Sequence, residues 1–441
     1  MTIRAGTASA GPGTGRIVTH PYPGLLHDRR GQPGLTDRPC GQPAPVRDGQ
    51  TPACGWVWPS IAAPPGRHLS VPPQSRQRPI AFFLPNLVGG GAERVIVNLA
   101  HGIADRGRAV DLVVGDARGE LAGQVPAGVR LTDLRAPRVL RCVVPLVAYL
   151  RHERPVALVS SMGHANLVAI WAGRLARQRT AVIATVHNTM SQSTPDQGRW
   201  AAWLWPRLLH TFYPWAHEVV SVSRGAADDL ARTAALPRER IRVIYNPVIT
   251  PAMEALAREP VEDPWFASGQ PPVILGVGRL NRQKDFATLV RAFAAVRQRR
   301  EARLVILGEG DERAALERLV TELGVARDVA LPGFRTNAVA HMARSAVFAL
   351  SSAWEGLPTV LIEALAAGAA VVSTDCPSGP REILQDGRLG ALVPVGDPAA
   401  LAAALLEALA RPASATPREA LAPFTMDAAV DHYLKLIEDA A

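Results

Sequence analysis

Two basic residues lie five positions apart in the loop after an apolar segment. Arg279 and Lys284 follow the predicted strand 273–277. Two cations in one loop can neutralise a diphosphate, both in a bound ligand and on a departing leaving group. The alternative explanation for Arg279 and Lys284 is an ordinary solvated basic loop that binds no ligand. The chain has only two lysines, Lys284 and Lys435, among 48 basic residues, and this scarcity favours a diphosphate site.

Two acidic residues flank the start of a predicted helix. Glu355 lies in the loop after the predicted strand 347–352, and Glu363 lies one turn into the helix expected over 359–368. Pro358 suits the first turn of that helix, whose N-terminus attracts an anion. Carboxylates on both sides of an anion site suit a sugar nucleotide, which has hydroxyls at both ends and phosphate in the middle. Either acid alone is better explained as an ordinary loop or helix-surface residue.

A run of three glycines precedes the helix expected over 92–107. Gly89, Gly90 and Gly91 would let the backbone approach a ligand, and the helix N-terminus favours a phosphate. A plain tight turn between a strand and a helix explains the glycines equally well.

His187 directly follows the predicted strand 181–186. At a strand end in a cleft, a histidine can donate to a sugar hydroxyl or respond to charge near the reacting carbon. A structural histidine is an equally good explanation, because the chain has ten others.

The segment 199–215 combines aromatic and basic side chains and contains four of the nine tryptophans. Such an amphipathic stretch suits a membrane interface or a lipid acceptor, and 138–154 is similar. Core packing against the first sheet is the alternative. The candidate acceptor or membrane contacts are Arg199, Trp200, Trp203 and Arg207.

Alternating strands and helices position these residues. The predicted strands of the first half are 79–85, 109–115, 156–160, 181–186, 218–222 and 241–248. A Pro-rich linker at 251–271 precedes a second half with predicted strands 273–277, 303–307, 329–333, 347–352 and 369–375. Its predicted helices are 285–300, 311–324, 337–345, 359–368, 397–411 and 426–440. This pattern indicates an α/β protein with two doubly wound parallel sheets, whose ligands bind at the carboxyl ends of the strands.

The predicted domains follow from this pattern. Residues 1–78 contain 13 Pro and 11 Gly and are expected to be a disordered extension. We expect an acceptor-binding domain over 79–255 and a donor-binding domain over 256–425. The helix 426–441 is expected to pack back on the first domain.

Composition excludes several classes of protein. The 441 residues are 48% hydrophobic and 20% charged, as in ordinary globular proteins. Most of the +9 net charge belongs to residues 1–78, which is weak support for a nucleic-acid partner, and we expect none. The four cysteines have no metal-ligand spacing and suit a reducing compartment. No signal peptide or membrane span is apparent, so a cytoplasmic location is expected.

An ordered set of motifs resembles the retaining GT-B glycosyltransferases of family four. The resemblance covers residues 79 to about 440 and rests on the whole set at suitable spacing, since each motif alone is modestly specific. The motifs are GGGAER (89–94), HNT (187–189), VSRGAADDL (222–230), IYNPV (244–248), GVGRLNRQKDF (276–286), LGEGDER (307–313), LPGF (331–334), the Glu-x7-Glu element 355–363 and CPSGPREIL (376–384).

The resemblance implies roles for individual residues. Arg279 and Lys284 would bind the donor diphosphate, Glu355 the hydroxyls of the donor sugar, and Glu363 the ribose. His187 would lie near the transferred sugar, and these residues except Glu363 form the expected catalytic set. The remaining donor contacts would come from Gly90 and Gly91 at the diphosphate, Thr359 and Val360 at the helix N-terminus, and Gly333 and Phe334 beside the nucleobase.

The resemblance also implies a reaction. It is transfer of a hexose or N-acetylhexosamine from a nucleotide sugar, by default a uridine one, with retained configuration and no metal or other cofactor. The CPSGPREIL form is similar to members that build lipid-linked or surface glycans, which suggests such an acceptor and peripheral contact with the inner membrane face. The Gly368–Val371 segment departs mildly from the family pattern. The alternatives are a GT-B epimerase, a phosphorylase using Lys284 or Lys435, or a non-catalytic nucleotide-sugar or polyanion binder.

Overall fold

The fold was analysed in a computed structural model of the chain. The structure describes residues 78–88, 90–193, 199–411 and 415–440. Apart from Arg78, the extension predicted over 1–78 lies outside these residues.

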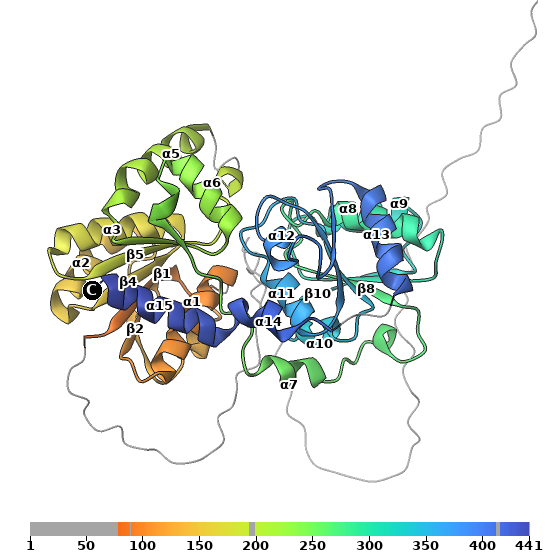
Figure 1. The fold of residues 1–441 in the computed structure, drawn as a ribbon, viewed down its shortest axis with the longest axis horizontal. Helices are drawn as coiled ribbons and strands as arrows, with labels where there is room; N and C mark the ends of the chain where they lie inside the picture. Colours follow the sequence, from red (N-terminus) through yellow and green to blue (C-terminus); the bar gives the residue numbers. More distant parts are fainter. Residues whose placement is uncertain (1–77, 89, 194–198, 412–414, 441) are drawn as a thin grey trace, which may run out of the picture. The chain divides into compact units, whose positions relative to one another are not determined.

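The first sheet has seven parallel strands in the order β3-β2-β1-β4-β5-β6-β7 (Figure 1). The central strand β1 is apolar on both faces, because Phe82 and Phe83 point into separate cores. Such a strand needs cover on both sides, which the helices supply. The strands are β1 (Ile80–Asn86), β2 (Val110–Asp116), β3 (Val129–Asp133), β4 (Ala157–Ser161), β5 (Ala181–Val186), β6 (Glu218–Ser221) and β7 (Ile241–Val243).

Two groups of helices cover this sheet. One core is shared with α2 (Val143–Glu153), α3 (Gly163–Ala176), α5 (Arg199–Phe212) and α6 (Arg224–Ala234). The other core is shared with α1 (Gly91–Asp105) and the C-terminal helix α15 (Met426–Ala440). A short helix, α4 (Met190–Ser193), follows β5.

The second sheet has six parallel strands in the order β10-β9-β8-β11-β12-β13. Its strands are β8 (Val273–Val277), β9 (Arg303–Leu307), β10 (Val329–Gly333), β11 (Val347–Leu350), β12 (Ala370–Thr374) and β13 (Ala391–Val393). One face is covered by α8 (Phe286–Arg297), α9 (Arg313–Glu322) and α13 (Pro398–Ala410). The other face is covered by α7 (Met253–Arg258), α10 (Ala338–Met342), α11 (Thr359–Ala366) and α12 (Pro380–Ile383). The short helix α14 (Arg418–Leu421) precedes the return of the chain to the first sheet.

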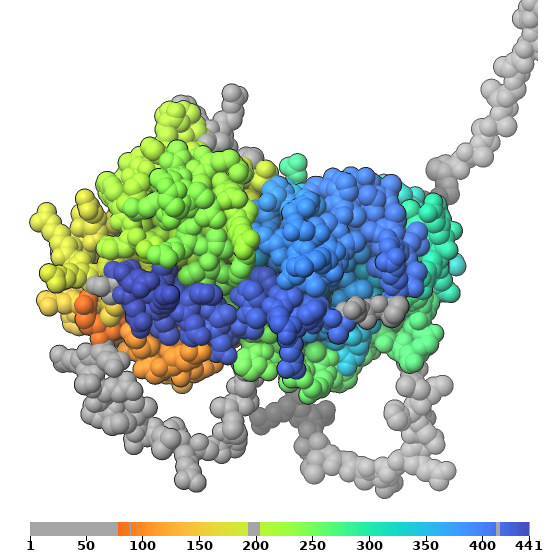
Figure 2. All heavy atoms as spheres, viewed as in Figure 1, coloured from red at the N-terminus to blue at the C-terminus, as the bar shows by residue number. Residues whose placement is uncertain are grey.

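The chain crosses between the sheets twice, and the two crossings are hydrogen-bonded together. The amide of Val248 donates to the carbonyl of Phe424, and the amide of Met426 donates to the carbonyl of Ile249, both at 3.0 Å. Beyond this point α15, dark blue in Figure 2, runs over the first domain and packs on α1. The approach needs a glycine, since a Cβ on Gly102 would lie 2.7 Å from a methyl of Val430.

The predicted fold class is confirmed, with local differences. The strand predicted over 241–248 ends at Val243, and by Val248 the backbone bonds to Phe424 in the crossing rather than to the sheet. The irregular linker predicted over 251–271 contains α7. Strands β3 and β13 were not predicted. Within the described ranges, no helix is long and apolar enough to cross a membrane.

Candidate active site

The loops after β8 and β9 are packed backbone against backbone. A Cβ on Gly308, whose φ is +138°, would lie 1.9 Å from the carbonyl oxygen of Gly278. The amide of Leu280 donates to the carbonyl of Glu309 at 2.9 Å. The glycines of the LGEG motif therefore allow the loop after β9 to pack closely against the loop after β8, which carries Arg279. Arg279 itself is exposed.

Lys284 and Glu355 form a direct ion pair. Lys284 Nζ donates to Glu355 Oε1 at 2.6 Å, and only 17% and 7% of the two side chains are exposed. The hydroxyl of Ser352 donates to the same carboxylate oxygen at 2.7 Å. The sequence suggested separate partners for the two residues, a phosphate and a sugar. The structure brings them together.

Hydrogen bonds to backbone carbonyls hold the two loops of this ion pair together. The hydroxyl of Ser351 donates to the carbonyl of Lys284 at 2.8 Å, and the amide of Ala353 donates to the carbonyl of Gln283 at 2.8 Å. The side chain of Gln283 donates to the carbonyl of Trp354 at 3.1 Å. The pair is therefore pre-positioned by its backbone rather than by two mobile side chains.

Helix α11 begins beside this pair. Pro358 is its N-cap, and Thr359 and Val360 form its partly exposed first turn. Glu363 lies one turn further, where burial raises the pKa of its carboxyl to about 7, although the charges of Arg94 and Lys284 oppose the rise. A helix N-terminus with a cation beside it is suited to a phosphate group.

The N-terminus of α1 contributes charges from the other domain. Gly90 is its N-cap, and a Cβ there would lie 2.4 Å from Glu93 Oε2, whereas Gly91 faces open space. Burial raises the pKa of Glu93, and the charge of Arg279 acts in the opposite direction. Burial likewise lowers the pKa of Arg94, and the charge of Glu363 acts in the opposite direction. The starts of α1 and α11 therefore share one electrostatic site.

His187 lies at the end of β5 and contacts the loop of Glu355. A Cβ on Gly356 would lie 2.0 Å from the carbonyl oxygen of His187, and Thr189 Oγ1 donates to the carbonyl of Glu355 at 3.3 Å. Both ring nitrogens of His187 are buried without a hydrogen-bond partner in the structure. Burial lowers the pKa of the ring to about 4, so the imidazole is neutral at physiological pH.

The end of β10 adjoins the loop after β9. The carbonyl of Gly333 accepts from the amide of Gly308 at 3.0 Å, and Gly333 has a φ of +81° that favours glycine. A Cβ there would lie 2.7 Å from Glu309 Oε1. Phe334 follows directly, so the predicted nucleobase border lies beside the loop that supports Arg279.

Helix α5 presents one face to the core and another to solvent. Leu209 is fully buried, whereas Trp203 is 53% and Leu204 46% exposed. The guanidinium of Arg207 lies 4.0 Å from the centre of the Trp203 ring. One face of the helix thus packs in the core, and the other presents apolar and basic side chains to solvent. The side chains of Arg199 and Trp200 lie outside the described residues.

Two residues of the site region were not singled out from the sequence. One is Arg94, within the GGGAER motif. The other is Glu382, whose carboxylate accepts from the amides of Arg224 and Gly225 and from the Tyr245 hydroxyl, each at 3.0 Å. Glu382 therefore caps α6 from the other domain. It lies in the motif CPSGPREIL, which was noted only for its family resemblance and did not indicate this contact.

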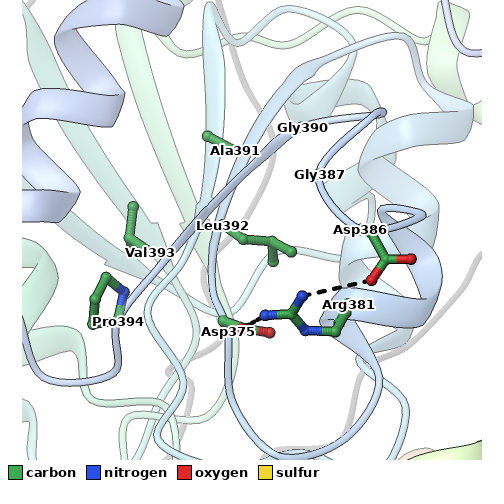
Figure 3. Close-up of a pocket in the computed structure, with 9 residues that line it drawn as sticks. All are labelled: Asp375, Arg381, Asp386, Gly387, Gly390, Ala391, Leu392, Val393 and Pro394. Atoms are coloured by element: carbon green, nitrogen blue, oxygen red, sulfur yellow. Dashed lines mark hydrogen bonds and ion pairs between the residues drawn. The ribbon is translucent and has the colours of Figure 1, made fainter.

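A hollow at the ends of β12 and β13 is lined by none of the predicted site residues (Figure 3). Arg381 is paired there with both Asp375 and Asp386. The local charge is net negative, which does not suit a diphosphate. Within the described ranges, no group of three or more His, Cys, Asp or Glu side chains is arranged to hold a metal ion.

Two family profiles match the chain. "Glycosyltransferase Family 4" matches residues 89–250, and "Glycosyl transferases group 1" matches residues 271–411. Together they cover more than half of the chain. The chain belongs to the GT-B glycosyltransferases.

Three known proteins illustrate the similarity. The N-acetylgalactosamine-N,N'-diacetylbacillosaminyl-diphospho-undecaprenol 4-alpha-N-acetylgalactosaminyltransferase of Campylobacter jejuni is 37% identical over 43% of this chain and 49% of its own length. The lipopolysaccharide core biosynthesis glycosyltransferase LpsE of Rhizobium meliloti is 29% identical over 79% of this chain and 96% of its own length. The solved structure of Anabaena HepE with UDP has a TM-score of 0.65 at 20% identity, over 82% of this chain and 100% of that one. The first alignment thus spans only about half of that relative.

Proposed function

We propose that this glycosyltransferase moves a hexose or N-acetylhexosamine from a nucleoside-diphosphate sugar, by default a uridine one, to a hydroxyl of a lipid-linked or surface glycan. The bond between the anomeric carbon and the phosphate oxygen breaks, and a bond to the acceptor oxygen forms on the same face. The acceptor proton passes to the leaving diphosphate. The products are the extended glycan and a nucleoside diphosphate.

The observation that carries this proposal is the Lys284–Glu355 pair beside the N-terminus of α11. An ammonium has three donors, and Glu355 takes one, so two remain for phosphate oxygens. Glu355 has a second carboxylate oxygen available for a sugar hydroxyl. Arg279 supplies a second cation near the same loop, so that diphosphate charge can be neutralised without a metal ion. Metal independence is part of the proposal.

His187 contributes a neutral ring under this proposal. Because its pKa is about 4, it can donate one hydrogen bond to a sugar hydroxyl without adding charge. Its two unpartnered nitrogens leave that bond to a ligand. The catalytic set is therefore His187, Arg279, Lys284 and Glu355.

The acceptor class is proposed from the relatives. One relative's name specifies a diphospho-undecaprenol-linked glycan, and another's specifies lipopolysaccharide core biosynthesis. The exposed Trp203 and Leu204, with Arg207 beside them, suit an acceptor held at an anionic membrane surface. The location that follows is peripheral, on the cytoplasmic face of the membrane.

The phosphorylase alternative needs a lysine for a Schiff base with pyridoxal phosphate. Lys284 is engaged with Glu355, and Lys435 is exposed on α15. Neither arrangement favours that chemistry.

The test of the proposed function is nucleoside diphosphate release by the full chain from a panel of nucleotide sugars, with EDTA present and with a lipid-linked acceptor. Release from one donor, with transfer to the acceptor and an α linkage from an α donor by NMR, is the expected result. Absence of both release and thermal stabilisation by every donor would contradict it, since a ligand at a hundredfold excess over its Kd stabilises by about 2.7 kcal/mol. Activity lost in EDTA and restored by a divalent cation would overturn metal independence alone.

A further inference from the structure

The hydroxyl of Ser223 makes hydrogen bonds in both domains. Ser223 is fully buried and is the N-cap of α6, where its Oγ accepts from the amide of Ala226 at 3.1 Å. The same hydroxyl donates to the carbonyl of Gly356 in the second domain at 2.7 Å. An N-cap needs only an acceptor, so α6 does not require this donated hydrogen bond. The second bond therefore has a task outside the helix.

The carbonyl that Ser223 binds belongs to the residue directly after Glu355. The carbonyl of Glu355 itself accepts from the hydroxyl of Thr189 at 3.3 Å. Both carbonyls of this dipeptide thus accept from buried hydroxyls of the first domain. The fit leaves no space for a side chain, since a Cβ on Gly356 would lie 2.0 Å from the carbonyl oxygen of His187.

The start of α6 contacts the second domain at a further point, where α6 and α12 meet (Figure 1). Besides the hydrogen bonds of Glu382, the backbones pack closely there. A Cβ on Gly225 would lie 2.8 Å from the carbonyl oxygen of Pro377, and a Cβ on Gly379 would lie 2.4 Å from Cδ of Pro358. The start of α6, the loop before α12 and the loop before α11 therefore form one packed unit.

This unit matters for turnover because the proposed catalytic groups come from both domains. His187 belongs to the first domain and Glu355 to the second. The side chain of Glu355 is held within its own domain by Lys284, whereas its backbone is held by hydroxyls of the other domain. A misplacement of about 1 Å between reacting groups can cost about a hundredfold in rate.

We propose that Ser223 is a positioning residue whose hydrogen bond to Gly356 holds the backbone of Glu355 in the position that sugar transfer requires. The inference rests on the proposed function, in which Glu355 binds the transferred sugar. It adds a residue that faces neither donor nor acceptor and acts on kcat through the loop after β11. Nucleotide binding should depend on it little, because Lys284 and α11 both belong to the second domain.

The test separates the donated hydrogen bond from the cap. Glycine is a tolerated N-cap, so Ser223→Gly removes the hydroxyl with little loss of the cap, whereas Ser223→Ala removes both. In both variants kcat for transfer should fall about tenfold, because the Gly356 carbonyl loses its donor in a buried site. The Kd of uridine diphosphate, measured by calorimetry, should be unchanged in both.

Three further variants complete the test. Asp397 is the N-cap of α13 and accepts from two amides within the second domain, so Asp397→Ala should lower Tm without changing kcat. Ser223→Thr keeps a hydroxyl that can cap and donate, and should restore most of the turnover. If Ser223→Gly does not fold, Ser223→Cys keeps the shape with a weaker donor and should also lower kcat.

The outcomes separate this inference from the proposed function. Natural kcat in folded Ser223→Gly overturns the inference alone. Equal losses in kcat and in affinity for uridine diphosphate also overturn it, because Ser223 would then act on nucleotide binding. A fall in kcat that Asp397→Ala shares overturns it as well, since the cause would be loss of stability. A natural protein that transfers no sugar from any nucleotide donor contradicts the proposed function itself, and this inference with it.

Discussion

Lys284 Nζ lies 2.6 Å from Glu355 Oε1, with both side chains largely removed from solvent. A buried ion pair is costly to assemble, and breaking it by removing one partner leaves an uncompensated charge. The pair joins the loop after β8 to the loop after β11, which are also joined through backbone carbonyls. It therefore holds the two loops of the proposed donor site together without a ligand.

Replacing Lys284 should abolish most turnover. Lys284→Met removes a proposed phosphate ligand and leaves Glu355 without its cation, so we expect kcat/KM to fall about 10³-fold or more. Lys435→Met is the matched control, because Lys435 is the other lysine of the chain and is exposed. Steady-state kinetics with circular dichroism on both variants makes the comparison. Near-natural turnover by folded Lys284→Met would remove Lys284 from the site.

His187 should make the protein sensitive to acid. Unfolded histidine takes up a proton near pH 6.5, whereas folded His187 stays neutral down to about pH 4. The unfolded state thus binds more protons between these values, so the free energy of unfolding decreases as pH falls. In His187→Gln, Tm should fall less between pH 6.5 and pH 4.5 than in the natural protein. His432→Gln, an exposed change on α15, is the control. Parallel Tm curves for natural and His187→Gln proteins would refute the expectation.

The fold was largely predictable because strongly apolar strands such as 80–86 and 273–277 are buried on both faces and stand out as short continuous runs. Strand β3 was not predicted because Arg130, Leu131 and Asp133 are exposed on the sheet edge, so its sequence lacks that run. Strand β13 has only three residues. Neither has a pattern that periodicity can detect.

The candidate site was predictable as a set of loops but not as a set of contacts. Strand-end positions located Arg279, Lys284 and Glu355, since parallel strands present their carboxyl ends at one edge. The pairing of Lys284 with Glu355 joins residues 71 positions apart. The burial of the Arg94 guanidinium and the hydrogen bonds of Glu382 to α6 arise between segments far apart in the sequence, which local spacing does not encode.

Glu382 should stabilise the contact between the two domains. Its carboxylate accepts from the first two amides of α6, where the helix dipole favours a negative charge. Glu382→Ala removes these hydrogen bonds, and we expect a loss of about 1–3 kcal/mol in the free energy of unfolding. Hydrogen exchange at the amides of Arg224 and Gly225 should accelerate.

Two further variants test the Glu382 contact. Glu419→Ala changes an exposed acid on α14 and should leave the same amides unaffected. Gly225→Ala should mimic the loss of Glu382, because its Cβ would lie 2.8 Å from the carbonyl oxygen of Pro377. Unchanged exchange in Glu382→Ala would show that the contact is incidental.

Helix α5 should direct the protein to anionic membranes. Trp203 and Leu204 expose neighbouring apolar side chains, and burial of such groups contributes about 1.5–3 kcal/mol each when complete. The double change Trp203→Ser, Leu204→Ser should therefore weaken co-sedimentation with vesicles of phosphatidylglycerol and phosphatidylethanolamine at least about tenfold. Leu323→Ser, an exposed apolar residue of the second domain, is the matched control. Turnover of a water-soluble acceptor should be unchanged in all three proteins, since such an acceptor does not need the membrane. Equal vesicle binding by the double variant and the natural protein would exclude this face of α5 as the membrane contact.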